Sequence, residues 1–300
     1  MVVRGGHTLS AAASHKGRLA AVFWITLGIL GAEIVGALIS GSLALFADAA
    51  HMFTDVAAIG LSLLAIRFAA RPATAGRTFG YYRVEILAAV CNAVLLFGAA
   101  VVIVVEAVSR LVTPPDVASG IMIAFGILAL AGNAVSLWLM RAGQRESLNI
   151  RGVFLEVASD MLGALAVVVS GVVIAVFGLH GADAVASILI AALILPRTWR
   201  LLRDAVDVLL EATPKGVDMD DVRHHIVETQ GVVDAHDLHV WCLTSGMNVV
   251  SAHVVVEPGA DHGIVLDRLT ACLGDHFDVE HSTFQIEYRD RRDVEEASHP

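Results

Sequence analysis

The chain has 300 residues, of which 56% are hydrophobic and only 17% are charged. This apolar content exceeds the roughly 45–50% of soluble domains and excludes an ordinary soluble protein. The net charge of −10 is uneven, because residues 1–212 carry 14 basic and 13 acidic side chains whereas residues 213–300 carry 6 and 17. The acidic C-terminal part repels nucleic acid, which excludes that class of partner. Its charge either concentrates cations near the protein or only keeps this part soluble.

Six apolar stretches dominate the first two thirds of the chain. Each is close to the roughly 20 residues that a helix needs to cross the hydrocarbon core of a lipid bilayer. The stretches lie at about 19–39, 42–66, 84–108, 117–140, 153–178 and 181–202. We therefore predict a six-helix transmembrane domain over residues 19–212, after a short N-terminal segment over residues 1–18. The first stretch is too long for the apolar part of a cleavable signal peptide.

Basic residues alternate along these spans, and the alternation predicts the orientation of the chain. Lysine and arginine gather before the first span, between the second and third, between the fourth and fifth, and at the end of the sixth: Arg4, Lys16, Arg18, Arg67, Arg71, Arg77, Arg83, Arg141, Arg145, Arg151, Arg197, Arg200 and Arg203. The other connections contain only Arg110. Because positively charged loops stay on the cytoplasmic side, we predict that both termini are cytoplasmic.

After residue 212 the pattern becomes that of a small water-soluble domain. Amphipathic helical spacing and strand-like alternation predict the order helix, strand, strand, helix, strand, at residues 218–229, 232–243, 247–257, 263–275 and 279–288. This order is typical of an α+β domain, which we place at residues 213–290. Residues 291–300 form a charged tail.

Ionisable residues inside the predicted spans point to function, because each costs about 2.5–3.5 kcal/mol at a helix centre on insertion scales. His51 and Asp55 are four residues apart in the second span, so they share one helical face. Glu156 and Asp160 repeat that spacing in the fifth span. Two such faces brought together offer one imidazole and three carboxylates, which predicts a buried site for a metal or for protons.

The ligand types indicate which metal such a site would take. Four nitrogen and oxygen ligands suit tetrahedral Zn²⁺. The absence of thiolates from the set disfavours Cu⁺, and the imidazole disfavours Mg²⁺ and Ca²⁺, which prefer oxygen shells. The cysteines at positions 91, 242 and 272 have no metal-binding spacing.

Two further acidic residues in the spans are possible accessory groups. Asp48 precedes His51 by three residues, so it either orients the imidazole or is a charge near the membrane surface. Glu33 in the first span is either a proton site or a hydrogen-bonding partner for another helix.

Several segments together resemble the cation diffusion facilitator family. They are SLALFADAAHMFTD at 42–55, RTFGYYRVEILAA at 77–89, FLEVASDMLGA at 154–164, HDLHVW at 236–241 and SAHV at 251–254. The resemblance implies a secondary active transporter rather than an enzyme. Such a protein exports Zn²⁺ or a related metal from the cytoplasm in exchange for protons. The resemblance also implies a homodimer in a bacterial inner membrane, with a ferredoxin-like cytosolic domain.

The resemblance assigns roles to particular residues. It implies a transport site at His51, Asp55, Glu156 and Asp160. It also implies a cytosolic metal site at His236, His253, His281 and Glu287, and a link between Arg83 and Glu211. Many zinc-transporting members have histidine where this chain has Glu156. A carboxylate makes the site harder, so Co²⁺, Cd²⁺, Fe²⁺ and Mn²⁺ are less strongly excluded.

The residues also predict a mechanism. Three carboxylates in an empty membrane site cannot all stay ionised, so protons partly neutralise them, and an arriving metal displaces those protons. Alternating access would turn this competition into metal–proton antiport. The alternative function is a membrane-anchored metal sensor that does not transport, which the histidines of the C-terminal part would suit. A membrane zinc hydrolase is disfavoured because the sequence lacks H-E-x-x-H.

Overall fold

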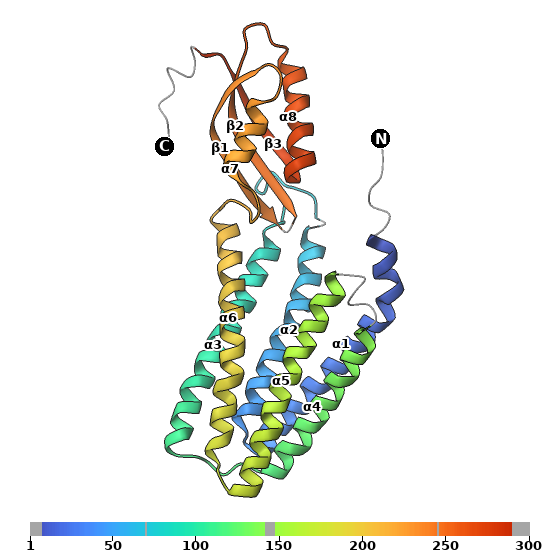
Figure 1. Cartoon of the computed structure of the whole chain (residues 1–300), viewed down its shortest axis with the longest axis vertical. Coiled ribbons are helices and arrows are strands. Elements are labelled where there is room, and N and C mark those ends of the chain that lie inside the picture. Colours follow the sequence, from blue (N-terminus) through green and yellow to red (C-terminus); the bar gives the residue numbers. More distant parts are fainter. Residues whose placement is uncertain (1–7, 70, 142–147, 245, 290–300) are drawn as a thin grey trace. The chain divides into compact units, whose positions relative to one another are not determined.

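The computed structural model describes residues 8–69, 71–141, 148–244 and 246–289 (Figure 1). The beginning of the N-terminal segment with Arg4, the loop with Arg145, and the tail with His299 lie outside the described residues. The chain divides into two compact units, one from residues up to 60 and 91–200, the other from residues 61–90 and 201 onward.

The described residues form six long helices that correspond to the predicted spans. They are α1 (Thr8–Ser40), α2 (Leu43–Ala69), α3 (Val84–Val112), α4 (Ser119–Met140), α5 (Leu148–Phe177) and α6 (Gly181–Leu209). Within the described residues, five of these helices, all except α2, are long and apolar enough to cross a membrane. α2 has 27 residues, about 40 Å of helix, and carries the charged residues of the predicted site. The predicted membrane-bundle fold is confirmed.

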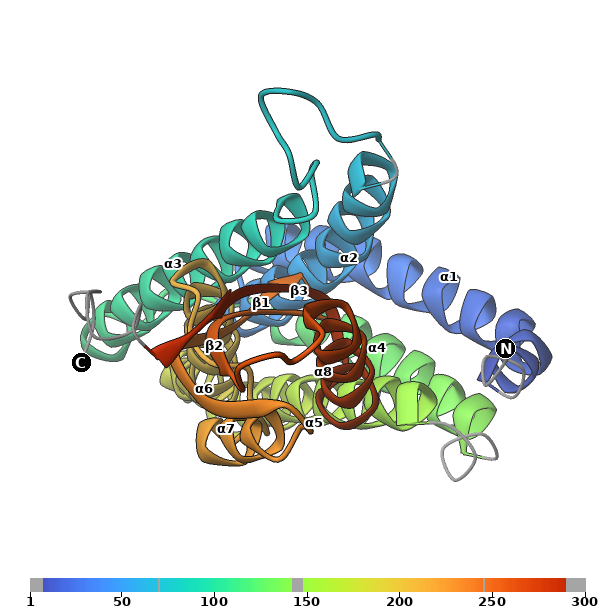
Figure 2. The same ribbon diagram turned by 90° about the horizontal axis from the view of Figure 1, so that it is seen from above.

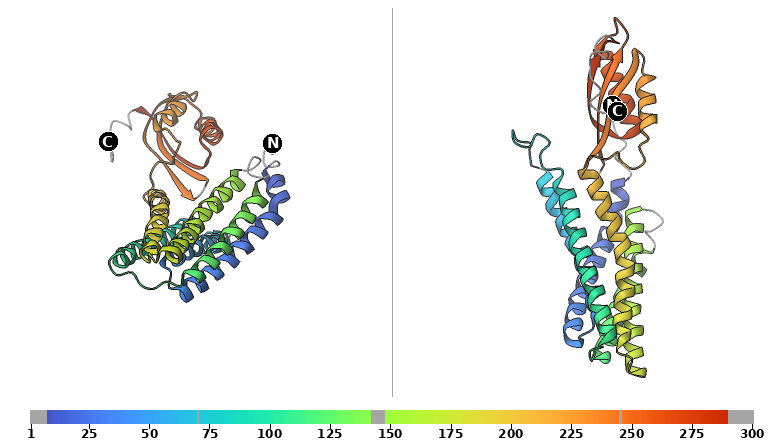
Figure 3. Two further views of the ribbon diagram at one scale, coloured as in Figure 1. Left: turned by 60° about the horizontal axis from the view of Figure 1, so that its bottom comes forward. Right: turned by 90° about the vertical axis from the view of Figure 1, so that its left-hand side faces the viewer.

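Small residues allow the helices of the first unit to pack closely. α4 lies between α1 and α5 and contacts both, as the left view of Figure 3 shows. A Cβ atom added to Gly132 of α4 would lie 2.6 Å from Cδ1 of Ile29 on α1. A Cβ atom at Gly171 of α5 would lie 2.7 Å from Cγ1 of Ile123 on α4. Glycine therefore permits the close backbone approach on which helix association in lipid depends.

A buried carboxylate holds the start of α2. Asp183 of α6 is only 1% exposed. It accepts hydrogen bonds from the Ser42 hydroxyl at 2.6 Å and from the backbone N–H groups of Leu43 at 2.7 Å and Ala44 at 3.2 Å. The guanidinium of Arg110 lies 3.8 Å away. A residue of α6 thus supplies the acceptors that the first N–H groups of a helix lack within the helix itself.

The C-terminal part of the second unit is an α+β domain. Its elements are α7 (Met219–Val227), β1 (Val232–Thr244), β2 (Met247–Val256), α8 (His262–Phe277) and β3 (Val279–Glu287). The sheet has the order β1-β2-β3, with β1 antiparallel and β3 parallel to β2. α7 and α8 lie next to each other against one face of the sheet (Figure 2), where they bury Val222, Ile226, Leu269 and Leu273. The predicted order of elements is confirmed.

Candidate metal centre

α2 and α5 bring three of the four predicted transport ligands together. Nε2 of His51 lies 3.6 Å from Oδ2 of Asp55 and 3.6 Å from Oδ1 of Asp160. One donor atom from each residue lies within 4.8 Å of the other two. Donors of a tetrahedral zinc site with ligand distances near 2.1 Å are about 3.4 Å apart. The three side chains can therefore surround one cation with little rearrangement.

The fourth predicted ligand has a different partner. Oε2 of Glu156 accepts a hydrogen bond of 2.6 Å from the guanidinium of Arg197 on α6. Glu156 also interacts with the carboxyl of Asp55, so it lies at the edge of the group. Arg197 was not among the predicted site residues and was counted only as a basic residue at the end of the sixth span. Its position directly after Pro196, inside the apolar run ALILPRTW, was the available signal.

Glu33 and Asp48 form a separate buried pair beside the group. They are 1% and 2% exposed, and their carboxyl groups, one on α1 and one on α2, are close enough to interact. The role of Glu33 as a proton site or as an interhelical hydrogen-bonding partner stays a prediction. Asp48 is not a surface charge.

Asp48 does not hold the imidazole of His51. Nδ1 of His51 is buried and has no hydrogen-bond partner among the described residues. Asp48 instead approaches α5 at Gly163, where an added Cβ would lie 2.5 Å from its Oδ1. It lines a cavity of about 20 Å³ together with His51, Asp160 and Arg197. A cavity of this size holds roughly one water molecule.

A second group of ligands lies on the sheet of the α+β domain. Oε1 of Glu287 lies 2.9 Å from Nδ1 of His253, and Oε2 lies 3.6 Å from Nε2 of His236. The Glu287 side chain is 0% exposed. Paired strands explain the arrangement, since His236 on β1 is opposite His253 on β2. The group can bind a metal, and Oδ2 of Asp237 lies 3.7 Å from Nε2 of His253 as a further acceptor that sequence reasoning missed.

His281 does not join this group, contrary to the site implied by the family resemblance. In the parallel pairing of β2 and β3, His281 is opposite Val249 whereas Glu287 is opposite Val255. Six residues along a strand correspond to about 20 Å. The His281 ring instead lies edge-on to Phe79, with 5.6 Å between ring centroids.

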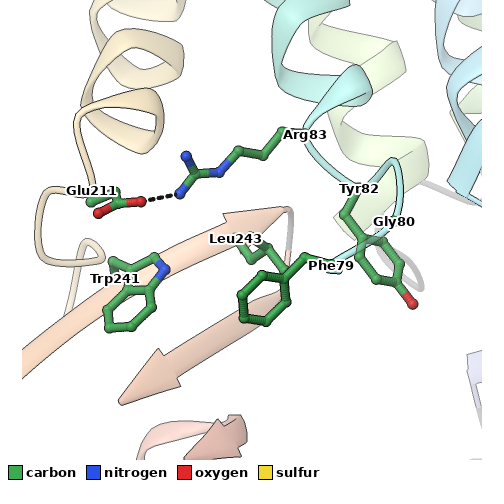
Figure 4. Close-up of a pocket in the computed structure, with 7 residues that line it drawn as sticks. All are labelled: Phe79, Gly80, Tyr82, Arg83, Glu211, Trp241 and Leu243. Carbon is green, nitrogen blue, oxygen red and sulfur yellow. Dashed lines mark hydrogen bonds and ion pairs between the residues drawn. The ribbon is translucent and has the colours of Figure 1, made fainter. Parts of the chain in front are cut away.

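Arg83 and Glu211 are paired, as the resemblance implied. Nη2 of Arg83 donates to Oε1 of Glu211 at 2.6 Å. Figure 4 shows this pair above the side chains of Trp241 and Leu243 at a pocket of about 260 Å³. Phe79 and Tyr82, from the segment before α3, also line the pocket. The pair thus joins the residues before α3 to the segment after α6.

Sequence comparison assigns both parts of the chain to a known family. Residues 19–210 match the cation efflux transmembrane domain, and residues 214–289 match the cytoplasmic domain of cation efflux proteins. The chain belongs to the cation diffusion facilitator family. It is a multi-pass membrane protein and a metal-cation efflux transporter.

Curated relatives of this cation diffusion facilitator span nearly its whole length. The metal cation efflux system protein CzcD of Cupriavidus metallidurans is 42% identical over 98% of this chain and 93% of its own. The zinc transporter ZitB of Escherichia coli is 40% identical over 91% and 87%. The cadmium, cobalt and zinc/H⁺-K⁺ antiporter of Bacillus subtilis is 36% identical over 94% and 92%.

A solved structure of a metal-bound C-terminal domain, that of the CzcD transporter of Cupriavidus metallidurans, also matches. It is 42% identical, covers 24% of this chain and 99% of that domain, and has a TM-score of 0.23.

The sheet group of this cation diffusion facilitator can be tested by Zn²⁺ binding. We expect Glu287→Gln to weaken binding at this group at least about tenfold, because the change removes its buried carboxylate charge. Calorimetry on the full chain in an Asp160→Asn background separates this group from the one in the bundle. His276→Ala is the control, since its ring bonds to the carbonyl of Cys272 on its own helix. Equal binding by Glu287→Gln and the control would contradict the assignment.

Proposed function

We propose that the chain exports Zn²⁺ from the cytoplasm in exchange for protons, with His51, Asp55, Glu156 and Asp160 as its transport site. One observation carries the proposal: donor atoms of His51, Asp55 and Asp160 converge within 4.8 Å on two helices of a membrane bundle. An imidazole with carboxylates suits Zn²⁺, and the carboxylates leave Co²⁺, Cd²⁺, Fe²⁺ and Mn²⁺ as further candidates.

Proton exchange is the expected consequence of this ligand set. Carboxylates and imidazole bind a metal only when deprotonated, so metal and protons compete for the same atoms. If the site opens alternately to the two sides, this competition couples metal export to proton entry. The antiporter named in the Bacillus subtilis relative supports the proposal.

The same proposal places both termini and the α+β domain in the cytoplasm of a bacterium, with the bundle in its inner membrane. The basic residues near the helix ends support this orientation. We also propose that two copies form a homodimer. Metal binding at His236, His253 and Glu287 would then report cytoplasmic metal to the membrane part.

Transport in proteoliposomes tests the function. We expect Zn²⁺ uptake into vesicles that are acidic inside, because protons leaving the lumen drive metal entry when the cytoplasmic side faces outward. Collapsing the pH gradient with an ionophore should reduce the initial rate at least about tenfold, and a K⁺ gradient alone should not replace it. Zn²⁺ uptake indifferent to the pH gradient would refute proton coupling. Binding without any uptake would favour the metal-sensor alternative.

A further inference from the structure

Arg197 is the cation closest to the proposed transport site in the described part of the bundle. Its guanidinium donates to Oε2 of Glu156 at 2.6 Å and lines the same cavity as His51 and Asp160. Its charge also acts on Asp55. The residue is held on α6, whereas the ligands come from α2 and α5.

The pairing changes the charge that surrounds a bound cation. Once the metal has displaced the protons, ionised Asp55, Glu156 and Asp160 with a neutral imidazole carry three negative charges. The guanidinium is always protonated, so it lowers the net charge of the group to two negative charges. That value is the complement of a divalent cation. The Glu156–Arg197 pair therefore has no net charge, and it contributes to the site as a neutral ligand would.

We propose that Arg197 is a specificity-determining residue of the transport site, a fixed countercation that pairs with Glu156 and matches the deprotonated site to a divalent ion. The inference rests on the proposed function, because it assigns a role to a neighbour of the proposed ligands. A loaded site is then close to neutral. Charge neutrality lets the site hold the ion in a low-dielectric bundle and still release it.

Other nearby charges do not perform this role. Arg200 lies about one turn further along α6 and donates to the carbonyl of Pro196 rather than to a proposed ligand. Nε of Arg203 lies 3.9 Å from Oδ2 of Asp207, so this guanidinium has a different carboxylate beside it. The countercation role therefore falls on Arg197 among the described residues.

A double-mutant cycle on the full chain tests the proposal. Glu156→His removes a negative charge but keeps a donor atom, which leaves Arg197 as an unmatched positive charge. We expect it to raise the Kd for Zn²⁺ at least about tenfold. Arg197→Gln alone leaves three carboxylates without a countercation, and we expect tighter binding with slower turnover. The double variant Glu156→His/Arg197→Gln restores the net charge and should bring Kd and initial rate to within about threefold of the native protein.

The outcome depends on whether the two changes are coupled. A double variant that transports no faster than the slower single variant overturns the proposal, whereas an initial rate within about threefold of the native protein supports it. Arg200→Gln is the matched control and should leave both quantities unchanged. If Glu156→His does not fold, as judged by size-exclusion chromatography and thermal melting, the cycle is repeated with Glu156→Gln and the same criterion applies.

Asp55→Ala separates this proposal from the proposed function. Native transport rates in Asp55→Ala mean that the transport site itself is wrong. Loss of transport in Asp55→Ala together with an additive Arg197 cycle means that only the countercation role is wrong.

Discussion

Replacing Asp160 by asparagine is expected to abolish metal-dependent transport, with a fall in initial rate of at least about 100-fold. The Asp160 carboxylate is only 5% exposed, and its Oδ1 lies 3.6 Å from Nε2 of His51. Asparagine has nearly the same shape but carries no charge, so the site loses a negative ligand without losing volume. The rate of Zn²⁺ uptake into proteoliposomes measures the effect.

A stability measurement distinguishes loss of the site from loss of the fold. The empty site crowds like charges, so Asp160→Asn should raise the melting temperature or leave it unchanged while transport disappears. Asp116→Asn, on an exposed loop, is the control and should preserve both. Substantial transport by Asp160→Asn would mean that the metal passes through a different set of ligands.

Removing the Asp183 carboxylate is expected to have the largest effect on stability. Asp183→Ala leaves the Ser42 hydroxyl and the N–H groups of Leu43 and Ala44 without their acceptor, and removes the carboxylate that lies 3.8 Å from the Arg110 guanidinium. Deleting one partner of a buried charged network costs about 3–5 kcal/mol. We expect a corresponding fall in the free energy of unfolding, measured by denaturant titration of the detergent-solubilised protein.

Graded variants show whether the capping contacts cause this loss. Asp183→Asn keeps one acceptor oxygen, so its loss should be smaller, at about 1–2 kcal/mol. Asp204→Asn, on the exposed part of α6, should have little effect. Equal stability of the native protein and Asp183→Ala would show that water satisfies the start of α2 instead. Because α2 carries His51 and Asp55, a loosened start should also lower the transport rate.

Local sequence pattern predicted the elements of this protein well. A helix repeats every 3.6 residues and a strand every two, so apolar spacing alone identified the long helices and the order of the C-terminal domain. The same periodicity placed His51 with Asp55, and Glu156 with Asp160, on single helical faces. These predictions depend on residues close together in the chain, whose geometry the backbone determines directly.

Contacts between residues that are distant in the chain could not be predicted from local sequence pattern. The hydrogen bond from Arg197 to Glu156, the carboxyl pair of Glu33 and Asp48, and the contact of Asp183 with Leu43 each depend on how one helix is rotated against another. A helix turns by about 100° per residue, so a small rotation changes which side chains meet. Spacing along the chain contains no information on that rotation.

The sequence by itself therefore determined the membrane class of this protein, its helix and strand order, and which ionisable residues share a face. Only the tertiary structure decided which faces meet, that Glu156 is paired with Arg197, and that the register of β3 on β2 brings Glu287 rather than His281 beside His253. The physical reason is that periodicity acts within one element, whereas packing and strand register act between elements.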